Sequence, residues 1–101
     1  MKKLLMFLLL AATLPLMAQR PVVFLHGWNS DGGIWKKMKT LLKDNAGYSS
    51  DDLHAFSYYD SPFGYSTSTP IETVAEGVAR EITEIYYDSG NQPVDIVTHS
   101  M

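Results

Sequence analysis

The sequence predicts an α/β fold in which three strands of a parallel sheet alternate with two helices. Three observations support this prediction. Residues 21–26 form a continuous apolar run that is rich in β-branched residues, two later segments carry apolar residues at helical spacing, and a further apolar run follows each helical segment. The order strand, helix, strand, helix, strand is typical of a parallel sheet with crossover helices, and both crossovers should be right-handed.

The first strand and first helix are predicted from residues 21–47. The run PVVFLH at 21–26 is apolar without alternation, as expected for a strand that is buried on both faces. A loop, GWNSDGG, follows at 27–33, and Asp31 is a suitable N-cap while Gly47 is a suitable helix stop. Four lysines, at 36, 37, 39 and 43, occupy one helix face. The other face carries the apolar residues Ile34, Trp35, Met38, Leu41 and Leu42.

The second half of the chain repeats this order. Residues 53–59 are the second strand candidate, and a loop rich in Ser, Thr, Gly and Pro follows at 60–70. Residues 69–72, Thr-Pro-Ile-Glu, predict a capping box with proline at the first helical position. Gly77 should slightly destabilise the helix, because glycine is unfavourable in a helix interior. The helix is predicted to end at Gly90, and residues 94–98 form the third strand. The apolar stripe of this helix consists of Ile71, Val74, Ala75, Val78, Ile82, Ile85 and Tyr86.

Two strand orders are compatible with this pattern. The strands lie either in sequence order, with both helices on one face, or with the third strand beside the first, with the helices on opposite faces. The second order places the fully apolar strand at 21–26 in the centre, which its composition favours. It also creates a topological switch point where ligands bind, beyond the carboxyl ends of the strands.

The first eighteen residues have the layout of a secretory signal peptide. Lys2 and Lys3 precede the largely apolar segment 4–16, and Ala18 offers a small residue for cleavage. The apolar segment is shorter than the roughly 20 residues that span a bilayer. An uncleaved N-terminal anchor and a buried helix are the alternatives, and Leu16 is larger than the residue usual at its position. We expect export to the periplasm or the medium, with residues 19–101 as the mature part and no membrane span in it.

Composition excludes several classes of protein. The formal net charge is −3, cysteine is absent, and no basic stripe occurs, so we expect neither disulfides nor a nucleic-acid partner. We predict no cofactor and no metal site. Residues 19–101 are fewer than the usual domain of about 100–150 residues, so the mature part should be marginally stable alone.

The last residues predict a chemical site. An apolar strand runs into His99-Ser100-Met101, which is the front half of a nucleophile elbow. The elbow predicts Ser100 as a catalytic nucleophile that forms an acyl-enzyme. It also predicts two backbone N–H groups that bind the oxyanion, from Met101 and from Trp28 in the loop after the first strand. Thr98 stands where the motif G-x-S-x-G has its first glycine.

Other polar residues have simpler interpretations. His54 lies within a strand candidate and is predicted to be structural, and His99 flanks the nucleophile with its side chain pointing away. Asp95 precedes the serine and therefore has the wrong chain order for the catalytic acid. Four aromatic residues near the end of the second strand either line an acyl pocket or pack in the ordinary way: Tyr58, Tyr59, Phe63 and Tyr65.

The two motifs PVVFLHGWNSDGGIW and VDIVTHSM resemble the secreted bacterial lipases of the α/β-hydrolase fold, the class 2 triacylglycerol lipases. The resemblance covers most of residues 20–101. It implies a three-stranded β-α-β-α-β portion of an α/β-hydrolase, truncated after the nucleophile strand, with His26 and Gly27 shaping the oxyanion loop. It also implies that an aspartate and a histidine further along the full-length protein complete the triad.

The resemblance implies a serine carboxylic ester hydrolase that acts on acylglycerols or other lipid esters, with transient contact to a lipid surface. An acyltransferase or a peptidase would use the same elbow, because each forms an acyl-enzyme. A binding module that has the sheet without the triad is the alternative outside enzymes. We expect residues 19–101 alone to be inactive.

Overall fold

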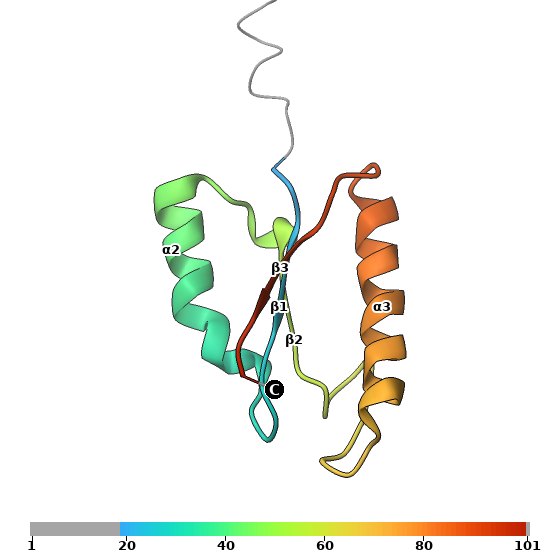
Figure 1. The fold of residues 1–101 in the computed structure, drawn as a ribbon. Helices are drawn as coiled ribbons and strands as arrows, with labels where there is room; N and C mark the ends of the chain where they lie inside the picture. Colours follow the sequence, from blue (N-terminus) through green and yellow to red (C-terminus); the bar gives the residue numbers. More distant parts are fainter. Residues whose placement is uncertain (1–18, 101) are drawn as a thin grey trace, which may run out of the picture.

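The computed structural model describes residues 19–100, and the predicted signal peptide and Met101 lie outside this range. Three parallel strands form one sheet in the order β2-β1-β3. The strands are β1 (Val22–Leu25), β2 (Leu53–Phe56) and β3 (Asp95–Thr98). The helices α2 (Lys36–Ala46) and α3 (Ile71–Asp88) flank the sheet on opposite faces (Figure 1). The strand order that places β1 in the centre is therefore confirmed.

The register of the strands brings the ends of β1 and β3 to the same edge. Val22 lies opposite Asp95 and Leu25 lies opposite Thr98, with four aligned residues in each strand. The ladder continues for one more bond, because the His99 N–H donates to the Leu25 carbonyl at 3.1 Å. The loop after β1 and the turn after β3 therefore meet at the carboxyl end of the sheet.

Each face of the sheet has its own apolar cluster. On the α2 face, Phe24 is fully buried and its ring lies 5.4 Å from the ring of Trp35. On the α3 face, Tyr58, Val74 and Val78 are buried, and the aromatic residues Tyr59, Phe63 and Tyr65 pack against them. All four aromatic residues thus take part in packing, and Tyr58 and Tyr59 also line a small hollow next to Trp28. Burial raises the pKa of the Tyr58 hydroxyl, and the neighbouring Tyr59 adds to that shift.

The first helical segment starts earlier than α2 and buries less than its pattern suggests. A 3₁₀ turn, η2 (Gly32–Trp35), precedes α2, and the predicted N-cap Asp31 accepts the Gly33 N–H at 2.6 Å. The predicted stop at Gly47 is confirmed, with φ of 73°. Of the five apolar residues, Trp35 is buried and Leu42 is partly buried. The other three, Ile34, Met38 and Leu41, are exposed, so most of this apolar stripe does not join the core in the described part of the chain.

The start of α3 differs from the predicted capping box. Pro70 is the N-cap, and no side chain caps the helix. The Thr69 hydroxyl instead accepts the Ser66 N–H at 2.9 Å, within the preceding loop. Gly77 is also more than a flaw, since a Cβ there would collide with the ring and hydroxyl of Tyr65. Gly77 therefore leaves the room in which the Tyr65 side chain packs against α3.

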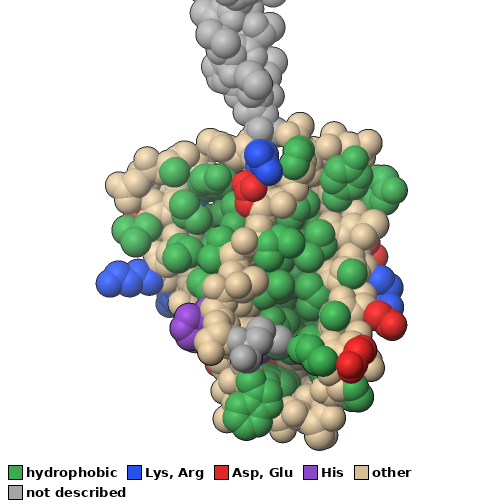
Figure 2. All heavy atoms as spheres, viewed as in Figure 1, with side chains coloured by type: hydrophobic (Ala, Val, Ile, Leu, Met, Phe, Trp, Pro, Cys, Tyr) green, Lys and Arg blue, Asp and Glu red, His purple; other side chains and the backbone are tan. Residues whose placement is uncertain are grey.

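The outer side of β3 is apolar and open in the described part of the chain. A hollow of about 260 Å³ runs between β3 and α3, with Leu25, Val78 and Ile82 among the residues that line it. Ile96 of β3 and Ile71 of α3 are about half exposed beside it. Hydrophobic side chains gather on this face in Figure 2. Among residues 19–100, neither helix combines the length and apolar character that a membrane span requires.

Candidate active site

A hollow of about 350 Å³ lies at the carboxyl end of β1 and β3. It brings together the loop after β1 and the turn after β3, the two stretches that contain the predicted oxyanion donor Trp28 and the predicted nucleophile Ser100. Its lining residues are Gly27, Trp28, Ser30, Ile34, Trp35, His99 and Ser100. Ligands of open α/β sheets bind at this edge, next to the switch point that the strand order creates.

Ser100 has the backbone of a strained turn. Its φ is +24°, which is unusual for a residue with a side chain. The strain falls directly after β3 ends at Thr98 and after the last ladder bond from His99. Strained φ values cluster at functional sites, where the surrounding structure holds them in place. The predicted nucleophile therefore lies in a sharp turn directly after β3.

Gly27 allows the two segments to touch. A Cβ at this position would collide with the Ser100 carbonyl oxygen and would lie 2.9 Å from the His99 carbonyl oxygen. Its φ is not positive, so steric room and not backbone freedom explains the glycine. The neighbouring Trp28 N–H has no acceptor within the described residues, and the Trp28 side chain is 68% exposed at the rim of the hollow.

His26 is fully buried behind this loop and both of its ring nitrogens are engaged. Nδ1 lies 2.7 Å from the Gly27 carbonyl oxygen, and Nε2 accepts the Tyr58 N–H at 3.0 Å. The carbonyl needs a donor and the N–H needs an acceptor, so the ring is neutral with its proton on Nδ1. A histidine held in this way has no free nitrogen with which to take a proton from Ser100.

The other two histidines are also badly placed for catalysis. The His99 ring lies on the α2 side of the sheet, in an edge contact 6.4 Å from the Trp35 ring. His54 lies near the amino ends of the strands. Within residues 19–100, no histidine or carboxylate forms a hydrogen bond with Ser100. Asp95, at the amino end of β3, pairs with Arg20 at 2.8 Å on the exposed surface.

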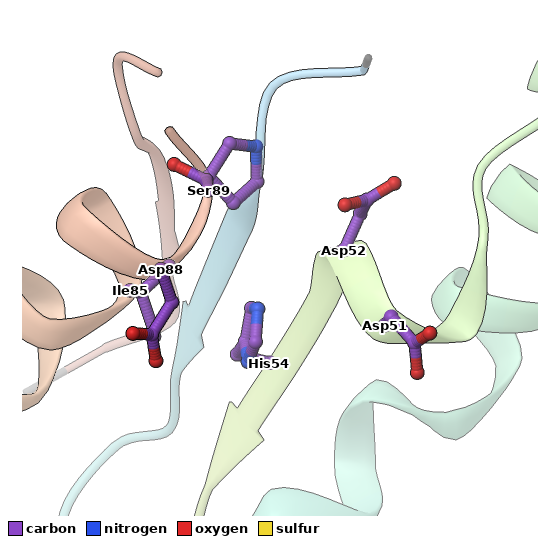
Figure 3. Close-up of a pocket in the computed structure, with 7 residues that line it drawn as sticks. Asp51, Asp52, His54, Ile85, Asp88 and Ser89 are labelled. Carbon is purple, nitrogen blue, oxygen red and sulfur yellow. The ribbon is translucent and has the colours of Figure 1, made fainter. Parts of the chain in front are cut away.

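Figure 3 shows the hollow around His54, which has a volume of about 190 Å³. His54 projects into it from β2, with Asp88 of α3 on one side and Asp51 and Asp52 on the other. Burial lowers the pKa of His54, Asp52 opposes that shift and Lys39 adds to it. No group of residues suited to hold a metal ion occurs in the described range. This hollow lies at the edge of the sheet opposite to the one that carries Trp28 and Ser100.

The geometry adds residues that the sequence motifs do not mark. Ser57 and Tyr59 both accept backbone N–H groups of the loop after β1, from Gly32 and from Asn29. Their partners are 25 and 30 residues away in the chain, so no short sequence motif predicts these contacts. Met101, the second predicted oxyanion donor, lies outside the described residues.

A parallel sheet with helices on both faces and a chemical hollow at its carboxyl edge defines a small α/β domain, compatible with part of an α/β-hydrolase. The sequence model of the family described as "Lipase (class 2)" matches residues 19–101. The chain therefore belongs to the class 2 lipase family, and its class of activity is lipase-like ester hydrolysis. Comparison with curated proteins and with solved structures gave no significant match.

Proposed function

We propose that the full-length protein is a serine ester hydrolase in which Ser100 is the nucleophile. The observation that carries the proposal is the positive φ of Ser100 in a turn against Gly27, beside a Trp28 N–H without an acceptor. In this mechanism Ser100 Oγ attacks the ester carbonyl carbon, the alcohol leaves, and water then releases the acid from the acyl-enzyme. The N–H groups of Trp28 and Met101 bind the oxyanion in each step.

The general base and its acid come from residues outside the described range. The buried His26 has both ring nitrogens engaged, His54 is at the opposite edge, and His99 faces Trp35. In elbows of this type the acid and the histidine follow the serine in chain order. We therefore propose that residues 19–101 are the N-terminal part of an α/β-hydrolase domain, with the remaining triad residues later in the full-length protein.

The proposed substrates are acylglycerols or other lipid esters. Apolar side chains border the hollow, with Trp28 68% and Ile34 47% exposed at its rim. Exposed apolar groups beside a polar turn suit an ester whose acyl part is hydrophobic, and they suit transient contact with a lipid surface. A chain-length series of p-nitrophenyl esters tests this substrate class, and rates that rise with acyl length from acetate to octanoate are expected.

The decisive experiment is labelling of the full-length protein with a fluorophosphonate probe, followed by peptide mapping. Labelling at Ser100 that is lost in Ser100→Ala is the expected result. Ser66 and Ser68, which hydrogen-bond each other at 2.9 Å in an exposed loop, are the internal controls. Labelling of either one with Ser100 unmodified would disprove the assignment.

We further propose that the protein is exported after cleavage following Ala18. The basis is the layout of residues 1–18, with two lysines before an apolar segment. N-terminal sequencing of protein recovered from the periplasm or the medium should begin at Gln19. Recovery of the protein only from membranes, with residues 1–18 retained, would support an uncleaved anchor instead.

A further inference from the structure

The segment that follows β2 holds the loop after β1 at three points. The Gly32 N–H donates to Ser57 Oγ at 2.7 Å, the Tyr58 N–H donates to His26 Nε2 at 3.0 Å, and the Asn29 N–H donates to Tyr59 Oη at 2.8 Å. Three consecutive residues, 57–59, thus bind three separate parts of the loop. The loop is anchored by the neighbouring strand end and not only by its own turn.

Hydrogen bonds also fix the two peptide groups on either side of Trp28. The Gly27 carbonyl and the Trp28 N–H belong to one trans peptide and point in opposite directions. The carbonyl oxygen lies 2.7 Å from His26 Nδ1 and 3.3 Å from the Ser30 nitrogen, which sets the direction of that peptide. The next peptide carries the Asn29 N–H, and Tyr59 Oη sets its direction.

We propose that the hydroxyl of Tyr59 is a positioning group for the oxyanion donor Trp28. This inference rests on the proposed function, since it assigns a task to a residue that does not touch the reacting atoms. Asn29 has φ of +57°, a conformation that non-glycine residues adopt at a cost, and its N–H is the group that Tyr59 holds. Without that bond, the peptide between Trp28 and Asn29 is free to rotate and to displace Ser30. That displacement weakens the 3.3 Å bond from the Ser30 N–H to the Gly27 carbonyl, which is one of the two contacts that direct the Trp28 N–H.

Tyr59 is suited to this task because its ring is itself held. It packs against the buried cluster on the α3 face, and its centroid lies 5.8 Å from the ring of His26. The hydroxyl therefore projects from a fixed ring. Its hydrogen bond with the Asn29 N–H holds the loop in a fixed position relative to the core. Geometric supports of this kind matter, because a misplacement of about 1 Å costs on the order of 10²-fold in rate.

The test is Tyr59→Phe, which removes the hydroxyl and keeps the ring. In the full-length protein, kcat and the rate of Ser100 labelling by a fluorophosphonate should fall about 10-fold or more, with KM within about twofold. The matched control is Tyr87→Phe on α3, because Tyr87 is 65% exposed and its hydroxyl has no hydrogen bond within residues 19–100. The control should match the wild type in kcat, KM and labelling.

A second measurement follows the loop itself by amide hydrogen exchange. The Asn29 amide should be protected in the wild type and should exchange about 10-fold faster in Tyr59→Phe, while the Gly32 amide, held by Ser57, stays protected. Wild-type labelling rates in Tyr59→Phe, or equal Asn29 exchange in both proteins, would overturn the positioning role alone. A wild-type protein whose Ser100 is not labelled would overturn the proposed function together with it.

Discussion

Gly27→Ala is the sharpest test of the contact between the loop and the elbow. The added Cβ would overlap the Ser100 carbonyl oxygen and would lie 3.0 Å from the Ser100 carbonyl carbon and 2.9 Å from the His99 carbonyl oxygen. All three atoms are backbone, so no side-chain rotation relieves the clash. The two segments must separate by on the order of 1 Å, a shift that costs about 10²-fold when it displaces reacting groups.

We therefore expect Gly27→Ala to lower kcat/KM for a p-nitrophenyl ester by about 100-fold in the full-length protein. Stability should fall by about 1–3 kcal/mol, the usual cost of forcing an extra methyl group into a packed site. The matched control is Gly47→Ala at the end of α2. Gly47 has φ of 73° and nothing within 4 Å of an added Cβ, so alanine there costs about 1–2 kcal/mol through backbone strain alone.

The comparison separates a positional effect from simple destabilisation. Both variants should unfold at lower denaturant concentrations than the wild type, whereas only Gly27→Ala should lose activity. Activity within about threefold of the wild type in Gly27→Ala would refute the reasoning, because the loop and the elbow would then tolerate a separation that the geometry forbids. Equal activity loss in Gly47→Ala would refute it as well.

Three further predictions concern the chain as a whole. Residues 19–101 alone should show no ester turnover that depends on Ser100, because none of the three histidines is placed to act as its base; p-nitrophenyl ester hydrolysis that Ser100→Ala abolishes would contradict this. The same polypeptide should associate at micromolar concentration through the apolar side of β3, and Ile96→Lys should reduce the association; sedimentation velocity that shows a wild-type monomer would rule it out. Burial holds the pKa of His54 below its ordinary 6.5. The stability that neutral His54 contributes is therefore complete above about pH 6.5 and is lost as the pH falls through the lower folded-state pKa. The free energy of unfolding, measured by urea titration across this pH range, should depend less on pH in His54→Gln.

Most of the fold follows from local patterns in the sequence. The unbroken apolar character of residues 21–26 predicts a strand buried on both faces, and Val23 and Phe24 are indeed fully buried in the centre of the sheet. Strand ends are less well defined. The predicted second strand runs to Tyr59, whereas β2 ends at Phe56 and residues 57–59 turn to bind the loop after β1. The apolar and aromatic composition of residues 53–59 does not distinguish a strand from such a turn.

The features that local patterns miss depend on partners outside each pattern. The capping box fails because the Thr69 hydroxyl binds the Ser66 N–H and not the helix start. Gly77 looks costly in a helix taken alone, but the Tyr65 ring occupies the space beside it. For the site, the motifs bring Gly27, Trp28 and Ser100 into one hollow as predicted, whereas the anchoring hydroxyls of Ser57 and Tyr59 carry no motif.

The position of Ser100 depends on the central strand more than on its own turn. The ladder between β1 and β3 extends past Thr98 through the His99 N–H and the Leu25 carbonyl, so the chain is still held one residue before the strained φ of Ser100. On the other side, His26 directly continues β1 and fixes the Gly27 carbonyl. One half of the proposed site thus follows β1 directly, and the other follows β3, which the ladder holds against β1. A substitution that shifts β1, such as Phe24→Ala, should therefore reduce Ser100 labelling as well as stability, because buried Phe→Ala changes cost about 3–5 kcal/mol and loosen the strand that places both loops.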